Sequence, residues 1–342
     1  MKKTRVAING AGRIGRAFLK TGIKRDEIEI VAINDLSSID NIAYLITHDT
    51  VYGKPSFEVS VSEDKKSLVV DGKTIAFLSE PDPSKLPWDE MSVDIVVEST
   101  GVFATYEKAR AHKDAGAKKV VISAPVKDDP QHDDEATVLM GVNDEKLKTC
   151  SITSNASCTT NAGSPLIQIL EEGLGIEKAL LNTVHAYTAT QSIVDGPSKK
   201  DMRKGRAAAQ NIIPTSTGAA IATTKVITQL TDKFDGIALR VPVPAGSIVD
   251  ITFIAKRETT VEEVNALLRS ASEMERWKSI FTVTEEDLVS SDIIGSPFAS
   301  IADLQMTRVV GGNLVKVLAW YDNEMGYTHS LLEHVVRLGS HM

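Results

Sequence analysis

The sequence is short of cysteine, of basic residues and of long apolar runs, and each shortage excludes a class of protein. Two cysteines, Cys150 and Cys158, cannot form a disulfide framework and favour a reducing compartment. Lysine and arginine total 38 against 46 acidic residues, and this net charge of −8 is atypical of a general nucleic-acid binder. No apolar run approaches the roughly 20 residues of a membrane helix, and the N-terminus does not resemble a secretory signal. We therefore expect a cytoplasmic protein that binds neither nucleic acid nor a membrane.

The remaining composition is typical of a globular protein with a sizeable core. The 342 residues are 42% hydrophobic and 25% charged, and a chain of this length suggests two domains. We find no internal repeat, and we expect no bound metal. The last four residues, 339–342, resemble a cloning remnant and are left out of the fold prediction.

The first forty residues carry a dinucleotide-binding fingerprint. A strand-like run ends at Asn9, and the glycine-rich turn Gly10-Ala11-Gly12-Arg13-Ile14-Gly15 opens an apolar helical pattern. A second strand-like run ends just before Asp35, which lies 20 residues past Gly15. Glycines let the backbone approach a pyrophosphate at the helix N-terminus. The Asp35 carboxylate can accept hydrogen bonds from the adenosine ribose and would repel a 2′-phosphate, which favours NAD over NADP.

Strands and helices continue to alternate through the first half. We expect a hairpin around Asp71-Gly72, a strand that begins at Val93, a helix over 106–115 and a strand over 118–123. This alternation predicts a doubly wound parallel sheet of the Rossmann type. Thr100, Gly101 and Ser123 then stand at carboxyl ends of strands, where such sheets bind ligands.

The second half has consecutive strands and predicts an α+β domain with a mainly antiparallel sheet. We expect strands over 180–185, 237–243, 247–256 and 314–321, with the second and third joined as antiparallel neighbours through Pro244-Ala245-Gly246. Helices are expected after Ala220 to about Leu230, over 260–272 and over 324–338. The long polar stretch 186–210 is typical of a functional loop. We predict an NAD-binding domain over 1–157, a catalytic domain over 158–321, and a C-terminal helix over 322–338 that packs back on the first.

The segment Ser154–Asn161, small and polar, contains the strongest candidate nucleophile. It joins a short strand to a helical pattern, so Cys158 should lie at a helix N-terminus, where the dipole favours a thiolate. His185, at the end of a predicted strand, is a candidate base for this thiol. The structural alternatives are a small buried cysteine among capping hydroxyls and a histidine that satisfies a strand end.

A second set of candidate site residues carries hydroxyl or guanidinium groups, which are suited to bind phosphates. They occur at Ser157, Thr159, Thr188, Thr190, Thr217, Arg203 and Arg240. Taken singly, each is better explained as a cap, a turn residue or a solvated charge. A nicotinamide cofactor and a cysteine nucleophile together indicate oxidation of an aldehyde through a thioester.

These residues and motifs together resemble the phosphorylating glyceraldehyde-3-phosphate dehydrogenase family from about Val6 to Val336. The matching stretches are 8–10, 12–16, 154–161, 185–191, 207–220, 240–242 and 320–324. The resemblance implies an NAD-dependent, cytoplasmic homotetramer of glycolysis and gluconeogenesis. Its substrates would be glyceraldehyde 3-phosphate and inorganic phosphate, and its product 1,3-bisphosphoglycerate. The polar loop after His185 would line the cofactor sites of neighbouring subunits.

The resemblance also implies roles for single residues. Cys158 would be the nucleophile and His185 the base, and Asn323 would hold the nicotinamide amide. The cofactor would further contact Gly10, Gly12, Arg13, Ile14, Gly15, Asp35, Thr100, Gly101 and Ser123. The substrate's phosphate would bind Thr188, Thr190 and Arg240, inorganic phosphate would bind Ser157, Thr159, Thr217 and Gly218, and Arg203 would serve between them.

Two alternatives to this function remain. A close relative oxidises erythrose 4-phosphate, although Thr188, Thr190 and the 216–218 turn favour glyceraldehyde 3-phosphate. A non-catalytic binding or redox-sensing protein on the same fold is the second, and the complete set of Cys158, His185 and the two arginines argues against it.

Overall fold

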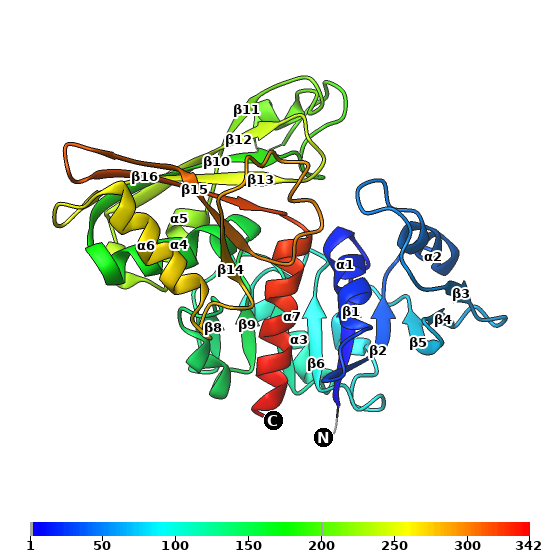
Figure 1. Cartoon of the computed structure of the whole chain (residues 1–342). Helices are drawn as coiled ribbons and strands as arrows, with labels where there is room; N and C mark the ends of the chain where they lie inside the picture. Colours follow the sequence, from blue (N-terminus) through cyan, green and yellow to red (C-terminus); the bar gives the residue numbers. More distant parts are fainter. Residues whose placement is uncertain (1–2, 200) are drawn as a thin grey trace. The chain divides into compact units, whose positions relative to one another are not determined.

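The alternating apolar runs of the first half form one sheet, as the sequence predicts. Residues 3–199 and 201–342 are described in this computed structural model, and within them the first sheet has nine strands (Figure 1). They are β1 (Thr4–Asn9), β2 (Ile28–Asn34), β3 (Val59–Val61), β4 (Ser67–Val70), β5 (Lys73–Leu78), β6 (Ile95–Glu98), β7 (Lys119–Ile122), β8 (Glu135–Thr137) and β9 (Ile152–Ser154), in the order β3-β4-β5-β2-β1-β6-β7-β9-β8.

Parallel pairing runs from β5 to β8, while β3, β4 and β5 pair antiparallel. The predicted hairpin is confirmed, because β4 and β5 meet at Asp71 and Gly72, which both have positive φ angles. Central strands such as β6 are buried on both faces, which explains why they read as unbroken apolar runs.

The helices of this half begin where the sequence places a cap. They are α1 (Arg13–Gly22), α2 (Ile39–Thr47) and α3 (Tyr106–Asp114), with short 3₁₀ turns η1 (Pro83–Lys85) and η2 (Asp144–Lys148). The Thr105 hydroxyl accepts a hydrogen bond from the Lys108 N–H, and this cap starts α3. The Rossmann-like prediction for the first half is therefore confirmed.

The second sheet is mainly antiparallel, as predicted. Its strands are β10 (Ile176–Ala186), β11 (Ile213–Ser216), β12 (Phe234–Val241), β13 (Ser247–Ala255), β14 (Phe281–Thr284), β15 (Ser300–Val310) and β16 (Leu314–Tyr321), in the order β11-β12-β10-β13-β16-β15-β14. Among the described strands of this second sheet, only β12 with β10 and β14 with β15 pair in parallel.

One predicted pairing is wrong. The strands β12 and β13 are not hydrogen-bonded neighbours, because β10 lies between them and pairs in parallel with β12 and antiparallel with β13. The connection over 242–246 contains Pro242 and Pro244, which lack the N–H groups of a tight hairpin ladder. This insertion of β10 brings its carboxyl end beside that of β12.

Helices cover one face of the second sheet. They are α4 (Cys158–Leu174), α5 (Ala219–Thr224) and α6 (Val261–Ser272), while α7 (Met325–Ser340) follows β16. The helix predicted after Ala220 begins slightly earlier, at Ala219, and ends at Thr224 rather than near Leu230, and the 3₁₀ turn η4 (Thr228–Leu230) follows it. A further turn, η3 (Met202–Gly205), lies in the polar stretch. Among the described residues no helix has the length and apolar character to cross a membrane.

The chain divides into two compact units. The first contains Met1–Val138, Asn143–Ala156 and Leu331–Met342, and the second contains Leu139–Val142 and Ser157–Ser330. The division falls between Ala156 and Ser157, one residue before the boundary expected from the sequence. The final helix contributes its second part to the first unit, and that part includes Gly339 and Ser340.

Candidate active site

A strained turn leads from β9 into helix α4. Ala156 is buried and has a φ angle of +53°, which residues other than glycine rarely adopt. Its N–H donates to Ser154 Oγ at 3.0 Å, and the Ser157 hydroxyl accepts from the Thr160 N–H at 3.1 Å as the helix cap. Cys158 is the first residue of the helix, so its predicted place at a helix N-terminus is confirmed.

Cys158 contacts His185, which lies near the end of β10. The distance from Cys158 Sγ to His185 Nε2 is 3.3 Å, and the imidazole is buried while the cysteine is half-buried. His185 pairs in register with Arg240 of β12, so both side chains lie on the sheet face that α4 covers. The structure thus brings together the cysteine, the histidine and one arginine that the sequence analysis singled out.

The imidazole proton is constrained by Arg240. Its Nη1 lies 2.5 Å from His185 Nδ1 and 3.0 Å from the Ala186 carbonyl oxygen, and that same carbonyl lies 2.6 Å from Nδ1. A guanidinium nitrogen only donates, so Nδ1 accepts from Arg240 and the imidazole proton sits on Nε2, facing the sulfur. When Arg240 is drawn away, Nδ1 can donate to the Ala186 carbonyl and Nε2 becomes an acceptor for the thiol proton.

Burial opposes the thiolate that the helix position favours. It raises the pKa of the Cys158 thiol, and the positive charge of Arg240 and hydrogen bonds from Thr159 offset this only in part. Burial and the Arg240 charge lower the pKa of His185 to about 3. Burial therefore opposes both charged forms of this pair, the thiolate of Cys158 and the imidazolium of His185.

This arrangement predicts the pH dependence of thiol alkylation. A His185→Asn variant lacks the imidazole that takes the thiol proton once an anion draws Arg240 away from Nδ1, and burial keeps the pKa of the Cys158 thiol above its usual value. In the presence of inorganic phosphate, thiolate in the variant then forms only as the pH rises through this elevated pKa, so alkylation by iodoacetamide at pH 7 should slow by at least about tenfold relative to the wild type and recover in alkaline solution. Rates measured from pH 6 to pH 10 test this, and superimposable profiles for both proteins would contradict a role for His185 as base.

Tyr321, at the end of β16, was not predicted as a site residue. Its ring stands edge-on to the His185 imidazole at 5.8 Å between centroids. Its hydroxyl hydrogen-bonds Thr159 Oγ1 at 2.9 Å and Thr183 Oγ1 at 2.7 Å. It therefore fixes the orientation of both the imidazole and the first turn of α4. The only sequence signal was its place directly before Asp322 and Asn323.

The predicted phosphate-binding groups lie on separate segments of the second unit. Thr188 and Thr190 follow β10, and their hydroxyls hydrogen-bond each other at 2.9 Å. The exposed Arg203 lies in η3, and its N–H is held by Asp201. Thr217, followed by the cap residue Gly218, accepts from the Ala219 N–H at the start of α5. Of the predicted arginines, Arg240 contacts the cysteine–histidine pair directly through His185.

A hydrogen-bond chain orients Asn323. The Ala186 N–H donates to Ser247 Oγ at 3.1 Å, and this hydroxyl donates to Asn323 Oδ1 at 3.0 Å. Since Oδ1 is already used, the Asn323 amide presents its N–H₂ group as a donor. That orientation suits a carbonyl oxygen as ligand, such as that of a nicotinamide carboxamide.

The first unit contains a cavity of about 340 Å³ at the carboxyl ends of its central strands. It is lined by Asn9, Gly10, Gly12, Asn34, Asp35, Leu36, Glu80, Pro81, Pro83, Ser99, Thr100, Val102 and Phe103. Gly10 has a φ of +97°, and a Cβ there would meet the Thr100 backbone nitrogen at 2.7 Å, so the close approach of two loops requires glycine. At Gly12, by contrast, an added Cβ would have no other atom within 4 Å, so there is open space beside this residue.

These features fit a dinucleotide. Gly12 caps α1 without a side-chain bond, and the N-terminus of that helix, at Arg13 and Ile14, favours a bound anion. The Asp35 carboxylate accepts the Ala11 N–H at 2.7 Å and the Ser37 N–H at 2.8 Å, and it lines the cavity. Gly101 lies in the turn after β6, next to Thr100. Ser123 directly follows β7, and its N–H donates to the Glu98 carbonyl.

Asp35 should determine the choice of cofactor. An Asp35→Asn variant keeps the shape of the side chain but removes the charge that repels a 2′-phosphate, so the preference for NAD over NADP should fall by about tenfold. The ratio of kcat/KM for the two cofactors measures this. Asp40→Asn, on the exposed surface of α2, has the same effect on net charge and should leave the ratio unchanged. An unaltered ratio in Asp35→Asn would place the ribose elsewhere.

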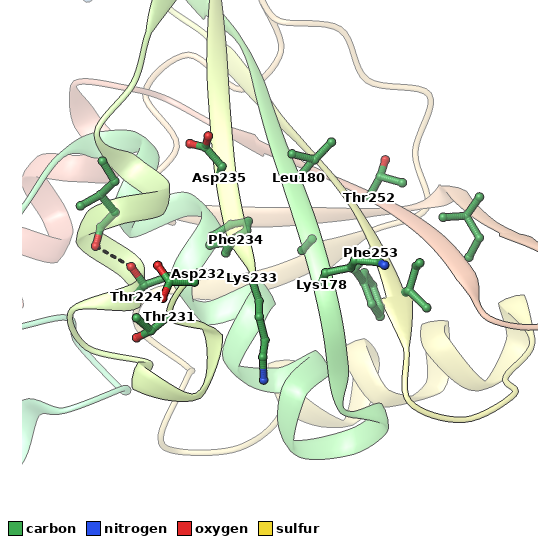
Figure 2. Close-up of a pocket in the computed structure, with 14 residues that line it drawn as sticks. Lys178, Leu180, Thr224, Thr231, Asp232, Lys233, Phe234, Asp235, Thr252 and Phe253 are labelled. Atoms are coloured by element: carbon green, nitrogen blue, oxygen red, sulfur yellow. Dashed lines mark hydrogen bonds between the residues drawn. The ribbon is translucent and has the colours of Figure 1, made fainter.

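A second hollow, of about 950 Å³, lies away from these residues within the second unit. Figure 2 shows that it is lined by side chains such as Lys178 and Leu180 of β10, Phe234 and Asp235 of β12 and Thr252 of β13. These residues stand near the amino ends of β10 and β12, whereas His185 and Arg240 stand at the carboxyl ends. The hollow is therefore separate from the cysteine–histidine pair.

Comparison with known protein families matches both units. Residues 4–106 match the family described as "Glyceraldehyde 3-phosphate dehydrogenase, NAD binding domain". Residues 157–323 match the family described as "Glyceraldehyde 3-phosphate dehydrogenase, C-terminal domain".

Individual relatives match over nearly their whole length. A glyceraldehyde-3-phosphate dehydrogenase of Streptomyces coelicolor is 48% identical over 341 residues, which cover 99% of each chain. One from Geobacillus stearothermophilus is 47% identical and covers 98% of each chain. One from Thermotoga maritima is 50% identical over 332 residues, 96% of this chain and 97% of the relative.

Proposed function

Since the chain belongs to the glyceraldehyde-3-phosphate dehydrogenase family, we propose that it oxidises glyceraldehyde 3-phosphate with NAD and inorganic phosphate. The observation that carries this proposal is the 3.3 Å contact between Cys158 Sγ and His185 Nε2 at the start of α4. A first unit that matches an NAD-binding domain supplies the redox partner, and a nucleophilic thiol supplies the covalent route.

Addition of the thiol to the aldehyde is the first step. Sγ forms a bond to the carbonyl carbon as the C=O double bond becomes single, and the thiol proton passes to His185 Nε2 and from there to the carbonyl oxygen, which becomes the hydroxyl of a hemithioacetal. The backbone N–H groups of Cys158 and Thr159, at the N-terminus of α4, favour the negative charge that develops on that oxygen. Bound NAD supplies the nicotinamide ring that accepts the hydride of the hemithioacetal carbon.

His185 is also the proton acceptor in the steps that follow. Loss of hydride leaves a thioester on Cys158, and the hydroxyl proton of the hemithioacetal passes to Nε2 once that atom is free. An oxygen of inorganic phosphate then attacks the thioester carbon, the bond to sulfur breaks, and the acyl phosphate leaves. Buried Tyr321, against the edge of the imidazole, keeps the ring aligned through these transfers.

Arg240 couples substrate binding to this base. Its guanidinium donates to His185 Nδ1, which keeps the imidazole proton on Nε2. A substrate phosphate that engages Arg240 together with Thr188 and Thr190 releases Nδ1 for the Ala186 carbonyl. Nε2 then accepts the thiol proton, so the base becomes available when the phosphorylated aldehyde is present.

We also propose that the chain assembles as a homotetramer. The face of the second sheet opposite α4 exposes large apolar side chains, among them Leu180 at 66% and Ile237 at 55%. The polar loop after His185 also exposes Ile193 and Val194. Apolar surface of this extent favours burial against another copy. Light scattering of the purified protein tests the proposal.

The two free cysteines support a reducing compartment, and we propose the cytoplasm.

The decisive experiment for the activity is an assay of NADH formation with glyceraldehyde 3-phosphate, with and without inorganic phosphate. Turnover that requires phosphate supports the phosphorylating reaction. Faster turnover with erythrose 4-phosphate would indicate the close relative, and no turnover with either would indicate a binding or redox-sensing role.

A further inference from the structure

A buried carboxylate lies beneath the proposed cofactor cavity and takes no part in the mechanism above. Glu98 ends β6, is 2% exposed, and accepts hydrogen bonds at both oxygens from residues that line the cavity or lie behind it. On the first oxygen, Oε1 accepts from the Thr100 N–H at 2.8 Å and from the Thr100 hydroxyl. That hydroxyl in turn accepts from the Val102 N–H at 3.1 Å, so the carboxylate holds the turn after β6.

The second oxygen receives a chain of side-chain amides. Asn9 Nδ2 donates to Glu98 Oε2 at 2.6 Å, and Asn9 Oδ1 accepts from Asn34 Nδ2 at 2.7 Å. Asn34 is fixed by the Glu80 backbone, because its Nδ2 donates to the Glu80 carbonyl and its Oδ1 accepts from the Glu80 N–H, both at 2.9 Å. Backbone groups have fixed roles, so they determine the orientation of both amides.

A histidine completes the arrangement from α3. His112 Nε2 lies 3.0 Å from Glu98 Oε2, and His112 Nδ1 lies 3.1 Å from the indole nitrogen of Trp88. The indole N–H only donates, so Nδ1 accepts and Nε2 carries the proton toward the carboxylate. Every group that faces Glu98 is therefore a donor, and a side chain that accepts on both oxygens is required.

From this geometry we infer that Glu98 is a positioning residue for the cofactor, whose negative charge sets the direction of a hydrogen-bond relay through Asn9 and Asn34 to the Glu80 backbone. The relay crosses the carboxyl ends of three neighbouring strands, and Asn9, Asn34, Glu80 and Thr100 all line the cavity. The relay thus fixes both the turn after β6 and the part of the cavity wall formed by Asn34 and Glu80. This inference rests on the proposed cofactor site and names what shapes it.

A Glu98→Gln variant tests the relay because two explanations predict opposite signs. Removal of a negative charge beneath an anion site would by itself strengthen the binding of AMP or NAD. The relay predicts weaker binding, since a glutamine amide must turn its N–H₂ toward Thr100 or toward Asn9 and His112, all of which donate. We expect Kd for AMP and NAD, measured by calorimetry, to rise by at least about tenfold.

Matched measurements separate the relay from its alternatives. Glu107→Gln, on the exposed first turn of α3, has the same effect on net charge and should bind AMP within about twofold of wild type. Thermal unfolding of the ligand-free proteins shows what fraction of each is folded at the temperature of the binding measurement. A raised Kd can then be distinguished from unfolding. Unchanged or tighter AMP binding in folded Glu98→Gln would overturn the inference. Failure of the wild type to bind AMP and NAD would instead contradict the proposed cofactor site.

A double-mutant cycle is the sharper test. Asn34→Ala removes the amide that links Asn9 to the Glu80 backbone, so Asn9 can turn to suit the side chain at position 98. The loss caused by Glu98→Gln should be smaller in this background, and the double variant should bind AMP at least about fivefold more tightly than the product of the two single losses predicts. Losses that simply multiply would overturn the relay. Should Glu98→Gln not fold, Asn34→Ala alone tests the relay, because it should raise Kd for AMP by at least about threefold, and unchanged binding in this folded variant would overturn the inference.

Discussion

A Cys158→Ser variant is expected to lose at least about 10⁴-fold of dehydrogenase turnover while it still binds NAD. The hydroxyl of serine has a far higher pKa than a thiol, and the site already raises the pKa of the group at this position by burial. The pKa of a hydroxyl is far too high for His185 to make serine an equivalent nucleophile. NADH formation measures turnover, and quenching of protein fluorescence by NAD measures cofactor binding.

Cys150→Ser is the matched control for this prediction. Cys150 is the other free thiol of the described chain, is buried in the first unit, and contacts the Asp133 carbonyl at 3.9 Å. Its replacement should leave turnover within a few-fold of wild type. Substantial residual turnover in Cys158→Ser, or an equal loss in Cys150→Ser, would contradict the covalent mechanism.

The second large effect concerns the two phosphates. Arg240→Leu should lower kcat/KM for glyceraldehyde 3-phosphate by about 10²-fold, because it removes a charged donor to the substrate's phosphate. Unphosphorylated glyceraldehyde should lose much less. Thr217→Ala, at the turn into α5, should instead raise KM for inorganic phosphate more than KM for the aldehyde. Steady-state kinetics with each substrate varied in turn measures these effects.

An exposed arginine serves as the control for the charge change. Arg269→Leu removes a guanidinium that pairs with Glu285 on the surface of α6 and should leave all three constants unchanged. The assignment of two separate phosphate sites would be wrong if Arg240→Leu and Thr217→Ala impaired both substrates equally. The cysteine mechanism would survive that result.

Local patterns predicted much of this molecule. The glycine turn before α1, the acid after β2 and the small polar segment before α4 each depend on a few consecutive residues, and the structure places all three as expected. Such features can be predicted because backbone geometry and helix caps are set within one turn of chain.

Contacts between distant strands were not predictable in this way. The sequence pattern of 237–256 does not reveal that β10 inserts between β12 and β13, and this insertion is what brings Arg240 to His185. The proton state of Cys158 also depends on burial, a property of the whole fold that the helix position alone cannot give. The direction of the Glu98 relay depends in the same way on backbone groups of Glu80, 18 residues earlier in the chain.

The register of β12 against β10 also determines which kinds of sequence change the site tolerates. Side chains alternate between the two faces, so a deletion of one residue within β12 would turn Arg240 to the open face and set an apolar neighbour beside His185. Substitutions on the open face, such as at Ile237, leave this phase unchanged. Across natural variants of the chain, length changes should thus be confined to the loops that flank β12, because a substitution within the strand preserves the alternation of faces that a deletion destroys.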